Sequence, residues 1–407
     1  MDTTILFTVA LGLQSPWFIK RVEFTGKGAD KQLHLYLDHQ KGVKFEYGDT
    51  LCPVYDHQDR KWRHLNFFEH ECYLHASVPR IKTPDGEVRL VEVPWAQPGS
   101  SFTLLFEAYA ALLVHGGMSM LSAGSYMGVD GRIVSRIISR MVATALATQE
   151  LEPVEHLGVD ETSITKGHNY ITVLTDISRK KVVGIALGKD VQAFNNALMD
   201  LESRGAKAED VKVVTMDMSP AYISAVQENM PKADIVFDRF HLHQSLNHAI
   251  DQIRREESKQ IKELRKTRFI WIKGYQKLSQ TQRNLVDQLA DTFPTIGKAY
   301  RLKEQFKVVL DEAYHKSDLE PLKQWKSLAL DSGIEHIISF VKTLERHWYG
   351  IVTYFQHHVT NAIAESVNLK IQQVKRVSRG VTNLQNFIHL IYFHLGGLDL
   401  NLPTKNS

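Results

Sequence analysis

The chain has 407 residues, of which 43% are hydrophobic and 23% are charged, and its formal net charge is only +3. This balance is typical of a globular protein with several domains, and it requires any basic surface to be local. The two cysteines, Cys52 and Cys72, exclude a disulfide framework and fit a reducing cytoplasm, where we expect the protein to act. No apolar run approaches the ~20 residues of a membrane helix, and residues 5–13 lack the preceding basic residues of a signal peptide.

The first hundred residues predict a small β-rich module. Short strand-like runs such as KQLHLYLDH (31–39) and EVRLVEVPW (87–95) alternate with turns rich in Pro, Gly and Asp. We therefore place one domain at residues 1–100.

Residues 101–150 predict helices and contain a helix-turn-helix candidate, MSMLSAGSYMGVDGRIVSRIISRM (118–141). Gly128 suits a tight turn, and Asp130 suits the first position of the second helix. On that helix Arg132, Arg136 and Arg140 are expected to face DNA. The alternative is an ordinary amphipathic pair of helices.

From residue 151 to 245 strand and helix signals alternate in the order β-β-β-α-β-α-β-α, which is that of a ribonuclease-H-like core. From 246 to 345 the pattern is helical throughout, which predicts a large insertion. Residues 346–407 would complete the core and contain a helix near 360–378. We therefore expect an α/β fold whose ribonuclease-H-like core is interrupted by an all-helical insertion.

Three acidic residues stand where a structural role is not obvious. Asp217 ends the β-branched run VKVVTMDMSP (211–220), Asp160 lies within the strand-like run HLGVDETSI (156–164), and Glu365 lies on the late helix. Each has a simpler interpretation. Asp217 could cap the next helix, Asp160 could pair with a basic residue at the end of the sheet, and Glu365 could lie on a solvated helix face. That face is a polar stripe of Asn361, Glu365, Asn368, Gln372, Lys375 and Arg379.

Taken together, Asp160, Asp217 and Glu365 favour a metal site. In the expected fold the first and fourth strands are neighbours, and a late helix can place an acid across their ends. Clustered carboxylates repel one another unless a cation neutralises them, and hard oxygen ligands suit Mg²⁺ or Mn²⁺. Two such ions can support an in-line phosphoryl transfer.

Three longer stretches resemble bacterial insertion-sequence transposases of the ISL3 type: GVDETSITKGHNYITVLTD (158–176), the run from Val213 to His241, and the run from Asn361 to Phe387. The resemblance covers nearly the whole chain. It implies that Asp160, Asp217 and Glu365 are the catalytic, metal-binding triad. It also implies that DRFH is an Asp-x-x-His element, in which Asp238 and His241 support the site.

The N-terminal module departs from that family, whose members generally carry paired Cys-x-x-Cys motifs. Tyr55 stands where the second cysteine of the first pair is expected, and Lys82 and Asp85 stand in place of the later pair. Cys52, His57, Cys72 and His75 remain as candidate zinc ligands, but their spacing matches no strong zinc pattern. We expect the module to be a degenerate zinc finger that does not bind zinc.

A second basic group lies beside Glu365. Lys370, Lys375, Arg376 and Arg379 are expected to contact DNA phosphates, which positions DNA without reading its sequence. Trp348 could stack on an unpaired base, or it could be a packing residue.

The sequence therefore predicts an enzyme that binds terminal inverted repeats, cleaves DNA and joins the new end to target DNA. Because strand transfer requires two element ends, we expect at least a homodimer, with DNA as its partner and no membrane. Two alternatives remain open. One is a transposase-derived DNA-binding regulator without catalysis, and the other is a ribonuclease-H-like nuclease without strand transfer.

Overall fold

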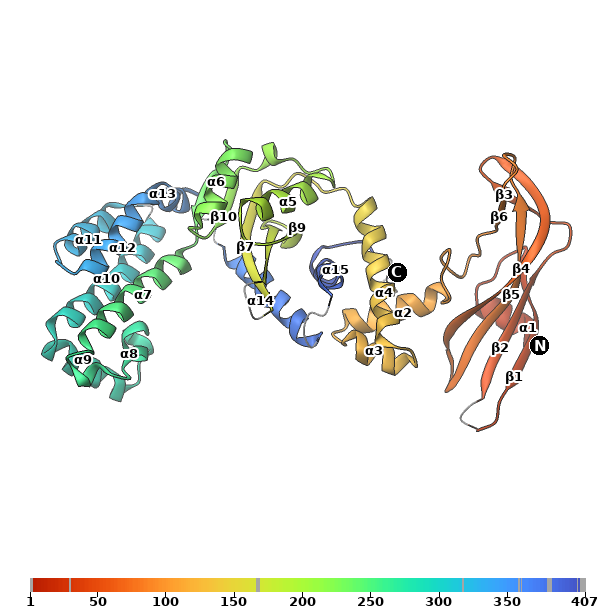
Figure 1. Ribbon diagram of the computed structural model, residues 1–407, viewed down its shortest axis with the longest axis horizontal. Helices are drawn as coiled ribbons and strands as arrows, with labels where there is room; N and C mark the ends of the chain where they lie inside the picture. The colour runs from red at the N-terminus through yellow and green to blue at the C-terminus, as the bar shows by residue number, and fades with distance from the viewer. Residues whose placement is uncertain are drawn as a thin grey trace. The chain divides into compact units, whose positions relative to one another are not determined.

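Figure 1 shows the computed structural model of the chain, which describes residues 3–28, 31–165, 169–316, 318–357, 359, 361–378, 383–400 and 402. The chain divides into two compact units, Met1–Ala145 with Asp399–Ser407, and Leu146–Leu398. Within the described ranges, none of the helices combines the length and apolar character that a membrane crossing requires.

The first unit is built on a six-stranded sheet. Its elements are helix α1 (Thr3–Ala10) and strands β1 (Trp17–Thr25), β2 (Gln32–His39), β3 (Lys44–Tyr47), β4 (Thr50–Phe67), β5 (His70–Lys82) and β6 (Val88–Leu90). The strand order is β1-β2-β5-β4-β3, and β6 pairs with β5. Only β2 and β5 run parallel; the other pairs are antiparallel. The expectation of a β-rich module is confirmed, although the long β4–β5 hairpin was not recognised in the sequence.

Three helices complete the first unit: α2 (Leu104–His115), α3 (Met120–Met127) and α4 (Gly131–Thr148), the last of which continues across the unit boundary. The turn between α3 and α4 is formed as expected. Gly128 ends α3 with φ 71°, a left-handed conformation that glycine adopts without steric cost. The Asp130 carboxylate accepts a hydrogen bond from the backbone N–H of Arg132 at 2.8 Å. The side chains of Ile137 and Ile138 are buried.

The second unit contains a five-stranded sheet. Its strands are β7 (His156–Thr165), β8 (Asn169–Asp176), β9 (Lys181–Leu187), β10 (Val213–Met216) and β11 (Asp234–Phe237). They lie in the order β11-β10-β7-β8-β9, with β7, β10 and β11 mutually parallel and the other pairs antiparallel. The helices α5 (Val191–Glu202), α6 (Pro220–Asn229) and α7 (Arg239–Glu257) follow β9, β10 and β11. The predicted element order and the pairing of the first with the fourth strand are both confirmed.

The two faces of this sheet have different compositions. On one face Leu157, Val159, Val214 and Met216 form a hydrophobic core with side chains of α5 and α6. On the other face the alternation of side chains along a strand places Gly158 and Asp160 on β7, and Thr215 and then Asp217 on β10. The helix α14 (Ala362–Val377), blue in Figure 1, lies along β7 on this second face.

Helices α7 to α13 gather together (Figure 1) and share one large hydrophobic core. Those not yet introduced are α8 (Arg268–Ile272), α9 (Gln280–Thr292), α10 (Pro294–Lys316), α11 (Glu320–Leu330), α12 (Glu335–Arg346) and α13 (Trp348–His357). Trp348 is partly buried against this core, and the Lys326 ammonium lies 5.2 Å from the centroid of its ring. These contacts favour the packing role for Trp348.

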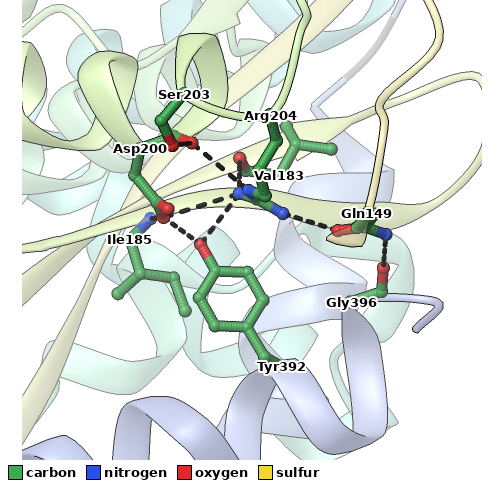
Figure 2. Close-up of polar contacts among 8 residues, drawn as sticks. All are labelled: Gln149, Val183, Ile185, Asp200, Ser203, Arg204, Tyr392 and Gly396. Atoms are coloured by element: carbon green, nitrogen blue, oxygen red, sulfur yellow. Dashed lines mark hydrogen bonds and ion pairs between the residues drawn. The ribbon is translucent and has the colours of Figure 1, made fainter. Parts of the chain in front are cut away.

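The last helix, α15 (Leu384–Leu395), is held to the sheet by a buried cluster around Arg204 (Figure 2). The guanidinium donates to the side-chain oxygen of Gln149 at 2.8 Å, to the carbonyl of Val183 and to the hydroxyl of Tyr392 at 3.3 Å. The Tyr392 hydroxyl donates to the carboxylate of Asp200, which also accepts the backbone N–H of Ile185 at 3.2 Å. We call these residues the Arg204 cluster.

Candidate active site

Three aspartates lie in a row across the parallel strands. Thr215 of β10 pairs with Gly158 of β7, so two residues further along Asp217 lies beside Asp160. Met216 pairs with Phe237 of β11, so one residue further along Asp217 lies beside Asp238. The backbone N–H of Asp238 donates to the carbonyl of Met216 at 3.0 Å, which extends the pairing to this level. We call Asp160, Asp217 and Asp238 the aspartate row.

Each carboxylate of the row is oriented by a backbone N–H that follows it in the chain. Asp160 accepts from Glu161 at 2.7 Å, Asp217 from Ser219 at 2.9 Å and Asp238 from Phe240 at 2.9 Å. Ser219, not Asp217, occupies the cap position of α6, whereas Asp238 itself caps α7. In each member of the aspartate row one carboxylate oxygen, Oδ1, therefore holds the side chain in place through a backbone N–H.

The second carboxylate oxygen of Asp238 differs from the first. The residue is 6% exposed, yet its Oδ2 atom is buried without a hydrogen-bond partner among the described residues. The Nε2 atom of the His241 ring lies 3.8 Å from Oδ2, beyond hydrogen-bond distance. A buried carboxylate oxygen without a partner is costly, so this atom indicates a site that is completed by another group.

Glu365 reaches the row because α14 approaches β7 closely. A Cβ atom at Gly158 would lie 3.2 Å from the Cβ of Ala364 and 2.6 Å from Cδ1 of Ile177, so a larger residue at Gly158 would displace its neighbours. Ala364 is buried and immediately precedes Glu365. Small residues on both elements thus bring the Glu365 carboxyl near the aspartates.

The electrostatics agree with a cluster of like charges. Burial, followed by the negative charges of Asp217 and Asp238, raises the pKa of Asp160 to about 6, against the opposing effects of the Glu161 amide and His241. Burial, followed by the neighbouring Asp238 carboxylate and then Asp160, raises the pKa of Glu365 to about 7. The charge of His241 opposes both shifts. The predicted acids therefore interact with one another, and their alternative roles as a helix cap, a surface ion pair or a solvated face do not account for this arrangement.

The donor set fits a hard divalent cation. Within the ranges that the structure describes, no group of three or more His, Cys, Asp or Glu side chains is arranged so that it could hold a metal ion unaided. Mg²⁺, however, is commonly bound by one or two carboxylates together with waters and substrate phosphates. The unpartnered Oδ2 of Asp238 and the mutual repulsion of the acids both suit such a cation.

The predicted DNA-binding residues fall into two groups. Arg132 and Arg136 are exposed on α4, where Arg132 pairs with Asp130 at 2.9 Å, and Arg140 pairs with the buried carboxylate of Glu107. On α14 Lys370 and Arg376 are exposed, whereas the Lys375 ammonium donates to the carbonyl of Ser163 at 2.9 Å. Arg379 lies outside the described residues. Arg132, Arg136 and Arg140 are thus exposed on α4, with Arg132 and Arg140 in ion pairs, and Lys370 and Arg376 are exposed on α14.

The four zinc-ligand candidates are not brought together. The ring of His57 stacks on that of His39, with Nε2 atoms 3.1 Å apart, and Nε2 of His75 lies 2.9 Å from Nδ1 of His34. Cys52 and Cys72 are buried in the core of the first unit, where burial raises the pKa of Cys72 to about 12.

Sequence reasoning missed the full part that α14 plays in the site. Asn361 and Asn368 belong to the polar stripe for which a solvated face was the simpler interpretation, but their side chains bond to β10 and β7. Asp238 was expected to support the site; its place in the row follows from the strand register. The signal that could have revealed the asparagines is their spacing of four before and three after Glu365.

Comparisons with known proteins identify the family of this chain. Residues 157–391 match the transposase domain of the ISL3 family, residues 91–142 match the helix-turn-helix domain of transposase family ISL3, and residues 50–84 match the zinc-finger of transposases IS204/IS1001/IS1096/IS1165. The chain is 25% identical over 378 residues to the transposase for insertion sequence element IS1557 of Mycobacterium tuberculosis, which covers 86% of this chain and 84% of the relative. It is 24% identical over 390 residues to the transposase for insertion sequence element IS1001 of Bordetella parapertussis, covering 93% and 95%.

The transposase domain alone spans more than half of the chain, and it contains the whole aspartate row and Glu365. The resemblance to the family expected from the sequence is thereby confirmed. The protein belongs to the ISL3 family of transposases and is a DNA transposase.

Proposed function

We propose that this transposase binds the terminal inverted repeats of an insertion sequence, cleaves the DNA in a metal-dependent reaction and transfers the new end to target DNA. The observation that carries the proposal is the aspartate row with Glu365 beside it, on a sheet of order β11-β10-β7-β8-β9. We propose that this sheet is a ribonuclease-H-like core, and that Asp160, Asp217 and Glu365 are its catalytic triad.

The side chains have distinct roles in this proposal. Asp160, Asp217 and Glu365 would hold Mg²⁺ or Mn²⁺, with two ions expected at the site. Bound cations supply charge neutralisation at the phosphate and activate the attacking hydroxyl. Asp160 and Asp217 are each oriented by a backbone N–H, which would hold their carboxylates in place for a cation without reorganisation.

Asp238 and His241 support the triad. Asp238 caps α7 and thereby fixes the end of β11 beside Asp217. His241 reduces the repulsion between the acids, because its charge acts on both Asp160 and Glu365. We do not assign either residue a bond-making step.

DNA binding is assigned to two surfaces. The exposed Arg136 and Arg132 of α4 would contact the terminal repeats, and Arg140 would hold α4 through Glu107. Lys370, Arg376 and Arg379 would contact phosphates near the cut, with Lys375 also fixing α14. Contacts of the second kind position DNA and carry no sequence information.

We propose that the chain has five functional parts, at residues 1–100, 101–150, 151–245, 246–345 and 346–407. We also propose a homodimer or larger assembly acting on two DNA ends in the cytoplasm. The zinc-finger match at residues 50–84 marks the origin of the first module, whose present side chains favour a structural role without zinc.

The test is cleavage of DNA that carries the element's own ends, in Mg²⁺ or Mn²⁺, by the wild type and by Asp217→Asn. The substitution keeps the size of the side chain and removes a ligand charge. We expect nicking by the wild type only, with a fall of at least about a thousandfold in the variant, and transfer of the cut end when target DNA is added.

Three other outcomes would contradict parts of the proposal. If both proteins bind the ends and neither cuts, the protein acts as a DNA-binding regulator. If the wild type cuts but never joins the ends to a target, it is a nuclease. If both proteins cut equally, Asp217 is not part of the active site.

A further inference from the structure

The polar stripe of α14 is spaced in a regular way. Asn361, Asn368 and Lys375 are seven residues apart, which is close to two helical turns, so the three side chains lie on one face. Glu365 lies on the same face, four residues after Asn361 and three before Asn368. Although a polar stripe on a helix is usually solvated, Asn361 is only 2% exposed.

Each of the three residues bonds to the sheet. The hydroxyl of Thr215 donates to Oδ1 of Asn361 at 2.9 Å, and the hydroxyl of Thr162 donates to Oδ1 of Asn368 at 2.6 Å. The amide nitrogen of Asn368 also donates to the carbonyl of Glu161 at 3.4 Å. The Lys375 ammonium donates to the carbonyl of Ser163 at 2.9 Å.

The sheet partners flank the catalytic acids. Thr215 lies two residues before Asp217 on β10, and Thr162 lies two residues after Asp160 on β7, so each threonine shares a face with its neighbouring aspartate. Both threonines are buried. The bonds to α14 therefore begin on the same two strands that carry the aspartates.

We propose that Asn361, Asn368 and Lys375 are positioning residues that hold α14 in a single register on β7 and β10, so that Glu365 meets Asp160 and Asp217. This inference rests on the proposed role of Glu365. Apolar contacts alone tolerate sliding and rotation of a helix, whereas each of these hydrogen bonds is formed in one register only. A slip of one turn would move Glu365 by about 5.4 Å and would leave buried polar groups unpaired, which is unfavourable.

The test removes one bond without changing side-chain size. Thr215→Val deletes the hydroxyl that bonds to Asn361, and Thr215→Ser keeps it. The matched control is Thr172→Val on β8, because Thr172 is equally buried but its hydroxyl bonds to the carbonyl of Gly188 and the hydroxyl of Tyr222. The full-length proteins are compared in single-turnover cleavage at saturating DNA, in affinity for DNA ends, and in Mn²⁺ binding measured by electron paramagnetic resonance without DNA.

We expect Thr215→Val to lower the cleavage rate constant about 10- to 100-fold and to weaken Mn²⁺ binding, with affinity for DNA ends unchanged. Thr215→Ser restores the rate, and Thr172→Val stays within about twofold of the wild type even if both valine variants melt at similarly lower temperatures. A double variant, Thr215→Val with Asn361→Leu, makes both members of the pair apolar. It should regain stability, because no buried polar group is left unpaired. It should not regain the cleavage rate, because the hydrogen bond that fixes the register of α14 is still absent.

Equal rates for Thr215→Val and Thr172→Val at matched stability overturn the inference, as does recovery of the rate in the double variant. If the wild type itself does not cut DNA, the proposed function fails. Amide hydrogen exchange then tests separately whether the hydrogen bonds hold α14 in one register on the sheet. Faster exchange across residues 362–377 in Thr215→Val than in Thr172→Val supports the positioning role, and equal exchange overturns it.

Discussion

The five-stranded sheet of the second unit carries two buried polar clusters that differ in the balance of their charges. In the Arg204 cluster a buried guanidinium is surrounded by a carboxylate, a hydroxyl, an amide oxygen and a carbonyl, all of which accept its N–H groups or bond to one another (Figure 2). The aspartate row instead brings three acids together beside Glu365, with one buried oxygen left unpartnered.

The balance of charges distinguishes a cluster that holds the fold together from a cluster suited to bind another group. A buried charge with complementary partners joins elements together, here the β9 region to α15. Buried like charges destabilise the protein that contains them, and they persist where they bind something else. The same sheet therefore has one polar cluster that stabilises the fold and one that costs stability.

The largest effect is expected from Arg204→Met, which leaves Asp200 without its cationic partner. Arg204 is 4% exposed and Asp200 is 31% exposed, so the loss should be smaller than the ~3–5 kcal/mol of a fully buried pair but should still lower the urea midpoint of the second unit. The control is Lys212→Met, because the ion pair of Lys212 with Glu155 is exposed and exposed pairs contribute little to stability. Similar losses in the two variants would mean that the Arg204 cluster does not hold α15.

Asp238→Asn is expected to leave stability unchanged or to raise it, in contrast to Arg204→Met. Asparagine also caps helices well, so α7 is kept while one negative charge leaves the row. Stability to urea should be unchanged or higher, while DNA cleavage should fall by about 10- to 100-fold. Asp200→Asn is the matched variant in the other cluster, and it should lose stability. If Asp238→Asn destabilises the protein as much as Asp200→Asn and cuts normally, Asp238 is a structural residue only.

A smaller effect on stability concerns the first unit, where the half-buried His64 bonds through Nδ1 to the hydroxyl of Thr103 at 2.9 Å. Burial, assisted by the charge of Arg63, lowers the pKa of His64 from 6.5 to about 4. Because the unfolded chain binds this proton at about pH 6.5, the stability contribution is complete above pH 6.5 and is lost as the pH falls toward 4. The loss is on the order of 2 kcal/mol.

Urea unfolding followed by tryptophan fluorescence at pH 7.5 and pH 4.5 measures this loss. His64→Gln cannot be protonated and should reduce the difference between the two pH values. An unchanged difference in that variant would assign the pH dependence to other groups, such as His75, whose pKa burial also lowers to about 4.

Much of the second unit could be predicted because its signals are local. The β-branched runs and the turn at residues 176–181 define strands directly, and Asp160, Asp217 and Glu365 stand out because acids are unusual in such surroundings. The neighbouring positions of the first and fourth strands also followed from the element order. The long β4–β5 hairpin of the first unit was missed because its polar, irregular alternation gives no clear period of two.

The sequence could not predict the register of α14 on the sheet or which side of this helix faces the strands. Whether a polar stripe on α14 meets water or threonines depends on strands about 150 to 210 residues away, and no local pattern encodes that distance. The hydrogen bond from the Lys375 ammonium to the carbonyl of Ser163 could not be predicted for the same reason, because Ser163 is distant in the sequence. Likewise, nothing in the sequence indicated that Gly158 allows the close approach of α14, because this role depends on the position of Ala364.

The placement of α7 to α13 between β11 and α14 has a consequence for the timing of activity. During synthesis the chain folds from its N-terminus, so the three aspartates leave the ribosome long before Glu365. The strands and their aspartates can assemble early, whereas the acid on α14 must wait for every helix of the insertion. Under the proposed role of Glu365, a polypeptide that ends before α14 carries the aspartate row but lacks the fourth acid of the site.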